Sequence, residues 1–373
     1  DEIDAVFIQI SENYIQGEDT LLLTGLHPTI TTSWSTTEGK LTLTALTSSP
    51  TAYIDLIAAV KDVLFQSNAL TISGEKHFSI TVDEANYLPS TGHYYEYVQD
   101  IGVTWSDAKI SAETSTHYGL QGYLATITSA EEAQLSGEQA IGTGWIGASD
   151  ATVEGTWRWV TGPEGLENGG LGRQFWLGRG IATGGTTTAP DNFAFWNSIV
   201  DEPNQDGNED YAHIVSPNLV PDDAILGSWN DLSNTGATSG DYQPKGYIVE
   251  YGGMSGDPIL NISASTKLTV ASISSTTNGS NCGAGTVTLS ANATLGANVL
   301  WFDSLTGGVQ LGSGTNFTTP SITSITTYYA LASEGGCITG VRTPIVATIY
   351  DIPTISSTTD VTICGAGSGT LMA

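Results

Sequence analysis

The sequence predicts a chain of several mainly β domains: a β-sandwich, an α+β domain with two helices, a second β-sandwich and the start of another. Three observations support this fold class. The length of 373 residues is typical of two to three domains. Short runs of β-branched and apolar residues alternate with turn-forming stretches, and the chain has 44 glycines. The phrase SSTTNGSNCGAGTVTLSA at 274–291 recurs as SSTTDVTICGAGSGTLMA at 356–373, an offset of 82 residues that is typical of one small β domain.

Residues 1–87 are expected to form the first sandwich. The segments 5–11, 20–25, 40–46 and 77–83 alternate apolar and polar residues, which indicates strands. The segment 51–67 instead has apolar residues at helical spacing and ends in a strand-like DVLFQS. This arrangement resembles a bacterial cadherin-like repeat, in which a short helical crossing precedes a strand. The resemblance implies a spacer role for this domain.

Residues 88–253 are expected to form the α+β domain. The segment 104–119 places apolar side chains on one helical face. A second helix is predicted from Ser129, a good N-cap residue, with Glu132 three positions on as the partner of a capping box. Many short strand-like runs surround these two helices.

The stretch 196–231 carries most of the chemistry. It is rich in side-chain oxygens and nearly free of His and Cys, and Ca²⁺ prefers six to eight oxygen ligands. The alternative is an acidic surface loop with a turn proline. WND at 229–231 argues against this alternative, because it repeats the Asn and Asp oxygen ligands after an aromatic residue. Pro203 also makes a cis peptide accessible, which would turn its two neighbours toward one point. The oxygen-bearing residues are Glu202, Asn204, Asp206, Glu209, Asp210, Asn230 and Asp231.

The phrases GLQGYLATITSAEEAQL (119–135), WIGASDATVEGTWRWVTG (145–162), EPN (202–204), WND and KGYIVEYGG (245–253) resemble a C-type lectin-like domain over about residues 91–253. The resemblance implies a principal calcium ion, and it implies that the same residues bind carbohydrate. In this family Glu-Pro-Asn accompanies vicinal equatorial hydroxyls of mannose, glucose or fucose-type sugars. The residues that match are Glu202, Asn204, Glu209, Asn230 and Asp231.

The resemblance also implies an auxiliary calcium site, although its WIGASDATVEG phrase could be kept for loop structure alone. One departure from the family concerns the disulfides, because residues 88–253 contain no cysteine. Ala112, Val249 and Tyr211 stand where family cysteines are expected, so we expect apolar packing of the many tryptophans to replace the bridges. The auxiliary residues are Asp150, Glu154, Asp206, Glu209 and Asp210.

Residues 254–351 resemble the Ig-like repeats of very large surface proteins in Bacteroidetes, and residues 352–373 would begin the next repeat. Within one such repeat, Cys282 and Cys337 would form a disulfide. Cys364 would then pair with a cysteine beyond Ala373, as expected for an odd cysteine in an oxidising compartment.

The composition of the chain excludes several classes of function and partner. Ten Lys and Arg against 39 Asp and Glu leave a formal net charge of −29, which argues against nucleic acid and anionic membranes as partners and suits a divalent cation. We expect no membrane insertion, because no run of about twenty apolar residues occurs. The five histidines are scattered and none accompanies a nucleophile motif, so we expect no enzyme and no catalytic residues.

The sequence is therefore interpreted as a calcium-dependent carbohydrate-binding module of a secreted or cell-surface bacterial adhesin. Its partners would be glycans on cell surfaces or polysaccharides, with self-association or contact with neighbouring Ig-like repeats as a further option. The alternative is a structural or protein-binding lectin-like module of a surface filament or gliding adhesin, in which calcium only orders loops. The abrupt start DEIDAVFIQI suggests an excised or mature fragment.

Overall fold

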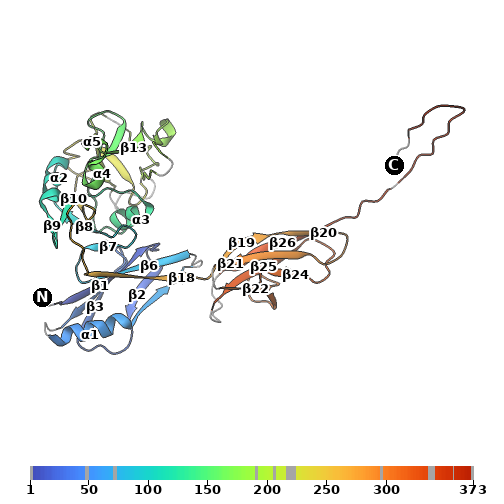
Figure 1. The fold of residues 1–373 in the computed structure, drawn as a ribbon, viewed down its shortest axis with the longest axis horizontal. Coiled ribbons are helices and arrows are strands. Elements are labelled where there is room, and N and C mark those ends of the chain that lie inside the picture. The colour runs from blue at the N-terminus through green and yellow to red at the C-terminus, as the bar shows by residue number, and fades with distance from the viewer. Residues whose placement is uncertain are drawn as a thin grey trace. The chain divides into compact units, whose positions relative to one another are not determined.

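The computed structural model describes residues 3–46, 50–69, 74–189, 192–204, 207–215, 224–294, 297–334, 341–355 and 357–370. The chain divides into two compact units (Figure 1). The first comprises the residues up to Ala69 and Glu75–Leu268, and the second comprises the short segment between these two ranges together with the chain from Thr269 onward.

The first sheet of the first unit has the strand order β18-β6-β1-β4-β3. A second, two-stranded sheet pairs β2 with β5, and helix α1 precedes β5, which confirms the helix-then-strand prediction for this segment. Buried side chains of β1 and β4, such as Ile8 and Leu43, pack against Leu56 of α1 to form the core. The elements are β1 (Ala5–Glu12), β2 (Asp19–Leu23), β3 (Ile30–Ser35), β4 (Lys40–Ala45), α1 (Pro50–Lys61), β5 (Val63–Ser67), β6 (Gly74–Thr81) and β18 (Ser263–Val270).

The α+β domain is inserted into this sandwich. Strands β6 and β18 are neighbours in one sheet, yet residues 82–262 separate them along the chain. The chain segments that enter and leave the inserted domain lie side by side, because Val82 N donates to Ile262 O at 3.3 Å. We expected a third domain to begin at residue 254. The structure instead assigns β18 to the first sheet, since its backbone completes the edge that β6 leaves open.

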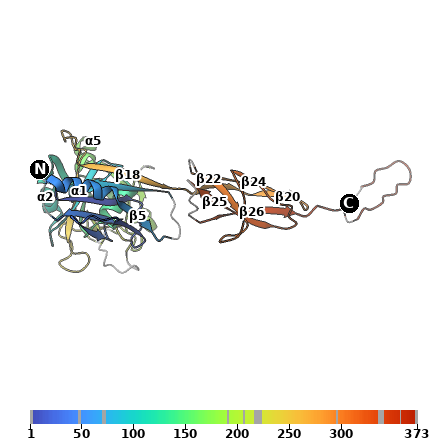
Figure 2. The ribbon, with the colours of Figure 1, turned by 90° about the horizontal axis from the view of Figure 1, so that it is seen from below.

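The inserted domain is built around β17, which pairs with β8 and β10 antiparallel and with β11 parallel. Its helices α2 and α5 are labelled in Figures 1 and 2. Its strands are β7 (Asn86–Leu88), β8 (His93–Gln99), β9 (Thr116–His117), β10 (Leu120–Leu124), β11 (Trp145–Ser149), β12 (Thr156–Trp159), β13 (Arg173–Leu177), β14 (Thr186–Thr187), β15 (Tyr211–Ile214), β16 (Trp229–Leu232) and β17 (Gly246–Tyr251). Its helical segments are α2 (Trp105–Thr114), α3 (Ala130–Ala133), the π-helix η1 (Gln134–Glu138), α4 (Gly162–Gly165), α5 (Glu167–Gly170) and the 3₁₀ segment η2 (Ile181–Thr183).

The two predicted helices begin at side-chain caps. Thr104 Oγ1 accepts from Asp107 N at the start of α2, and Ser129 Oγ accepts from Glu132 N at the start of α3, both at 3.1 Å. The expected capping box is only half formed. The Glu132 carboxylate accepts instead from the backbone N and the hydroxyl of Thr128, at 2.8 and 2.7 Å, so Glu132 faces the domain interior.

Aromatic packing fills the core of the inserted domain. Trp159 stacks on Phe175 with ring centroids 4.6 Å apart, and Trp229 meets Trp159 edge-on at 5.5 Å. A second cluster buries Ala112 and Val249 completely, and Tyr211 lies on Trp105 at 4.6 Å. Apolar contacts therefore occupy the three positions where the family resemblance predicts cysteines.

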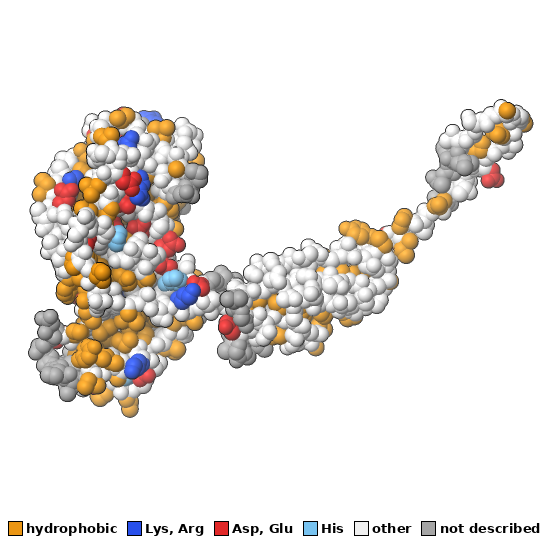
Figure 3. All heavy atoms as spheres, in the orientation of Figure 1, with side chains coloured by type: hydrophobic (Ala, Val, Ile, Leu, Met, Phe, Trp, Pro, Cys, Tyr) orange, Lys and Arg blue, Asp and Glu red, His pale blue; other side chains and the backbone are white. Residues whose placement is uncertain are grey.

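The second unit is a β-sandwich with one sheet of order β19-β21-β24 and another of order β20-β26-β25-β22-β23. Trp301 stacks on Phe317 at 5.2 Å in its core. Figure 3 shows few charged side chains on the visible face of this unit. After Tyr350 the described residues form no helix or strand. The strands are β19 (Ile273–Thr277), β20 (Gly279–Cys282), β21 (Thr288–Ala293), β22 (Asn298–Phe302), β23 (Gln310–Ser313), β24 (Asn316–Thr318), β25 (Thr326–Ser333) and β26 (Thr343–Tyr350).

Candidate metal and carbohydrate site

Backbone pairing brings the two halves of the predicted principal site together. An isolated parallel bridge joins Trp196 to Trp229, and Asn197 N donates to Trp229 O at 2.8 Å. Glu202 N then donates to Asn197 O at 3.1 Å, which closes a turn. The segment that carries Glu202 therefore lies against β16, which carries Asp231.

Asn204 connects the two carboxylates of this site. Its backbone N donates to Glu202 Oε2 at 2.9 Å and to Asp231 Oδ1 at 3.0 Å, and its side-chain Nδ2 donates to Glu202 Oε1 at 3.1 Å. The Glu202–Pro203 peptide is cis, as expected. The contacts thus bring together three of the five predicted principal ligands.

The fourth predicted ligand, Asn230, precedes Asp231 in β16. Its Oδ1 is buried and has no hydrogen-bond partner among the described residues. Glu202 and Asp231 are also buried. Burial raises the pKa of Glu202, and the hydrogen bond and negative charge of Asp231 raise it further. Two buried carboxylates joined through Asn204 suit a cation that takes oxygen ligands.

Glu209, the fifth predicted ligand, is half-buried, and its charge contributes to the raised pKa of Glu202. It does not complete a three-carboxylate cluster. In the described part of the chain, no three His, Cys, Asp or Glu side chains are grouped so that they could hold a metal ion. The candidate ligand set in the described residues is therefore a carboxylate pair with amide oxygens.

The predicted auxiliary site is less well assembled. Asp150 is buried, its N donates to Asp210 O at 3.2 Å, and its Oδ2 accepts from Gly155 N at 2.8 Å. This last bond closes the loop 151–155. It therefore favours the interpretation that the WIGASDATVEG phrase serves loop structure and not calcium binding. Glu154 is exposed, and Asp206 lies outside the described residues. An auxiliary calcium ion stays a prediction.

The predicted disulfide also stays a prediction, because Cys337 lies outside the described residues. Cys282 and Cys364 are exposed and are not bonded to each other.

A buried polar network in the inserted domain was not expected from the sequence. Tyr95 OH donates to Glu132 Oε1 at 2.8 Å and lies 3.3 Å from Glu250 Oε1, and His93 Nδ1 lies 2.6 Å from the same Glu250 oxygen. Burial, followed by the charge of Glu250, raises the pKa of Glu132. The available signal was Glu250 itself, a single acid within the otherwise apolar GYIVEY strand, all of which is buried.

The fold and the comparisons together define a multidomain, mainly β protein with an Ig-like domain. Residues 269–350 match the model of the Ig-like domain described as CHU_C associated. The chain is also similar to Halomucin of Haloquadratum walsbyi, with 32% identity over 268 residues. That alignment covers 69% of this chain and 3% of Halomucin, so this chain spans a small part of that relative.

Two solved structures give weaker similarities. A chimeric titin Z1Z2 tandem aligns at 14% identity over 34% of this chain and 80% of that chain, with a TM-score of 0.16. Domains 1–6 of the surface layer protein SbsC align at 9% identity over 96% of this chain and 54% of that chain, with a TM-score of 0.14.

Proposed function

We propose that this chain is a calcium-dependent carbohydrate-binding module of an extracellular bacterial adhesin. In this proposal a C-type lectin-like domain over about residues 91–253 carries the glycan site, and the Ig-like unit belongs to a stalk. The observation that carries the proposal is the junction of buried Glu202 and Asp231 through Asn204. The five phrases that resemble a lectin-like domain add to it.

The residues of the site have complementary roles. Glu202, Asn204, Asn230 and Asp231 would hold Ca²⁺, with Glu209 as a further ligand, and the ion would supply coordination positions for two vicinal hydroxyls. A sugar hydroxyl has one donor and two acceptor positions. Carboxylate oxygens can accept from such hydroxyls and amide NH₂ groups can donate to them. Glu202 and Asn204 already form such an acceptor and donor pair, with 3.1 Å between Oε1 and Nδ2.

An extracellular location is supported by the Ig-like match and by the repeat at 356–373, which is typical of modular surface proteins. Within the described residues, no helix has the length and apolar character needed to span a membrane. The sandwich and the Ig-like unit would then hold the lectin-like domain away from the cell. Glycans on other cells or free polysaccharides would be the partners.

A glycan array read with calcium and with chelator tests the proposal, followed by binding isotherms for methyl mannoside and methyl galactoside. The double variant Glu202→Gln with Asn204→Asp exchanges donor and acceptor while keeping oxygen ligands, so preference should move from the mannoside toward the galactoside. A wrong hydroxyl geometry leaves polar groups unpaired at a cost of about 1–3 kcal/mol each.

The matched control is Asp241→Asn, which removes an exposed carboxylate that belongs to neither predicted calcium site. It should leave sugar preference unchanged. If the parent protein binds neither glycoside at millimolar concentration while it still binds calcium, the carbohydrate proposal is wrong.

A structural or protein-binding role is the second candidate, and one observation favours it. Gln134 Nε2 donates to Tyr14 O at 2.9 Å, and Gln139 Nε2 donates to Ile10 O at 3.0 Å. These bonds run from the helical segment of the inserted domain to the backbone of the first sandwich. The inserted domain is therefore firmly attached, as a scaffold module requires. Glycan binding that depends on calcium would decide against this candidate.

A further inference from the structure

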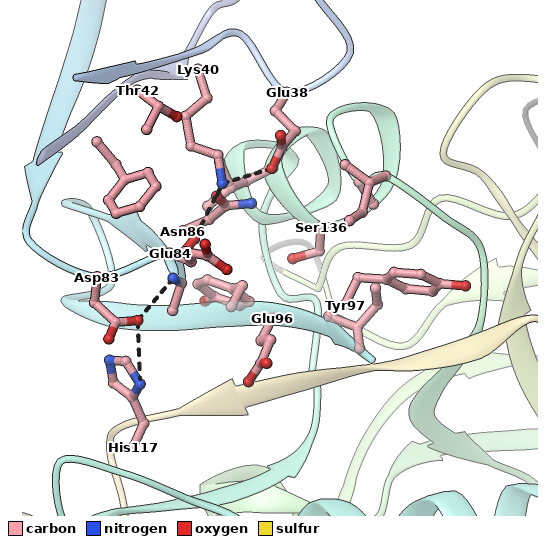
Figure 4. A pocket seen from close by; sticks show the side chains of 17 residues that line it. Glu38, Lys40, Thr42, Asp83, Glu84, Asn86, Glu96, Tyr97, His117 and Ser136 are labelled. Carbon is pink, nitrogen blue, oxygen red and sulfur yellow. Dashed lines mark hydrogen bonds and ion pairs between the residues drawn. The ribbon is translucent and has the colours of Figure 1, made fainter. Parts of the chain in front are cut away.

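The first unit contains a pocket of about 580 Å³ where the inserted domain meets the first sheet (Figure 4). Strand β4 supplies Lys40 and Thr42, the connection after β6 supplies Asp83 and Glu84, and β8 and the π-helix supply the opposite wall. This pocket does not include any residue of the candidate calcium site.

The pocket offers no available positive charge. Lys40 is its only Lys or Arg among the lining residues, and Lys40 Nζ is already engaged by Glu38 Oε1 at 2.6 Å, Asn86 Oδ1 at 2.7 Å and Glu84 O at 3.1 Å. An ammonium group has three donors, so these acceptors use all of them. An anionic ligand would therefore find no free cationic group in this pocket.

Carboxylates, by contrast, are in excess, since Glu38, Asp83, Glu84 and Glu96 all line the pocket. Asp83 accepts from Ala85 N and Tyr118 OH, and Glu96 accepts from Tyr251 OH. The Glu84 carboxylate is exposed and makes no hydrogen bond or ion pair with any described residue. Glu84 is thus the acceptor that a ligand can use.

A buried hydroxyl gives evidence of a ligand that is independent of the carboxylates. Ser136 of the π-helix is 2% exposed, and its Oγ has no hydrogen-bond partner among the described residues. Figure 4 shows this hydroxyl directed toward the interior of the pocket. His117 also lines the pocket, and its buried Nε2 has no hydrogen-bond partner within the described part of the chain. Buried polar atoms are normally satisfied, so two such atoms in one pocket indicate a polar occupant.

We propose that this pocket binds a small organic cation that carries a primary ammonium group. The ammonium would donate one hydrogen bond to the Glu84 carboxylate and a second to the Ser136 hydroxyl oxygen. Phe7 and Tyr97 would contact the carbon skeleton of the ligand. The described acidic residues do not group tightly enough for a metal ion, whereas an organic cation can extend between separated acceptors. An amino sugar and an amine side chain such as that of lysine share this chemistry.

The test is an isothermal titration of the full chain with n-butylamine, glucosamine and glucose, in chelator so that the candidate calcium site does not contribute. We expect saturable binding of at least one amine and none of glucose. Saturation by glucosamine alone identifies an amino sugar as the source, and saturation by butylamine identifies an amine side chain. Glu84→Gln should weaken amine binding at least tenfold, and Ser136→Ala should weaken it severalfold.

Because the chain is strongly acidic, the control must separate the pocket from general attraction of cations. Asp100→Asn removes an exposed carboxylate at the end of β8 that does not line the pocket, and it should leave amine affinity unchanged. Equal weakening by Asp100→Asn and Glu84→Gln would overturn the proposal. Equal binding of glucose and glucosamine would also overturn it, since the ammonium would then play no part.

Discussion

Replacing Glu132 with glutamine should stabilise the first unit at neutral pH. Glu132 is buried, and Tyr95 OH donates to Glu132 and lies 3.3 Å from Glu250 Oε1, which places the two carboxylates around one hydroxyl. Burial, and then the charge of Glu250, raises the pKa of Glu132 from 4.5 to about 7. A glutamine could still accept from Thr128 through its carbonyl and would carry no charge.

The sign follows from proton linkage. A carboxyl whose pKa is higher in the folded state binds its proton more tightly there, so stability falls as pH rises from about 4.5 toward 7. At about 1.4 kcal/mol per pKa unit, this difference corresponds to a loss of about 3 kcal/mol by pH 7. His93 acts in the same direction: although burial lowers its pKa, the hydrogen bond and charge of Glu250 raise it overall. The contribution of His93 to stability is therefore lost as pH rises through its folded-state pKa.

Urea unfolding followed by tryptophan fluorescence between pH 4.5 and 8 measures this effect. The parent protein should lose stability across the range, and Glu132→Gln should lose about 3 kcal/mol less. Glu131→Gln, an exposed neighbour in the same helix, should retain the parent slope. Parallel slopes for the parent and Glu132→Gln would refute the reasoning.

Three further predictions concern the core, the metal site and the second unit. Trp229→Ala should lower the free energy of unfolding by about 3–5 kcal/mol in urea titrations, because it removes a fully buried ring from the aromatic core; a loss below 1 kcal/mol would contradict that packing. Chelation should lower the melting temperature of the first unit and speed proteolysis near Glu202, since the site carboxylates then repel one another; an unchanged melting curve would count against the principal calcium site. Mass spectrometry without reduction should link Cys282 to Cys337 and leave Cys364 outside that link, with about 3–4 kcal/mol of stabilisation from a loop of about 55 residues; a Cys337–Cys364 link would contradict the predicted repeat.

The sequence predicted local features well. The helix α1 followed by β5 and the cap at Ser129 both depend on residues close together in the chain. Side-chain periodicity and capping chemistry act over a few residues, so they can be recognised without knowledge of the fold. The composition of the 196–231 stretch likewise indicated oxygen ligands before any contact was known.

The tertiary structure decided what depends on distant pairing. Strand β18 joins β6 across an insertion of residues 82–262, a connection that no local pattern encodes because any strand of suitable length could fill that sheet edge. The same long-range folding places Glu132 beside Glu250 and creates the pocket that contains Ser136 and Glu84. By itself, the sequence determined which residues could form strands, caps and oxygen ligands. Their burial, their partners and their shifted proton affinities followed only from the tertiary structure, because these properties depend on which surfaces exclude water together.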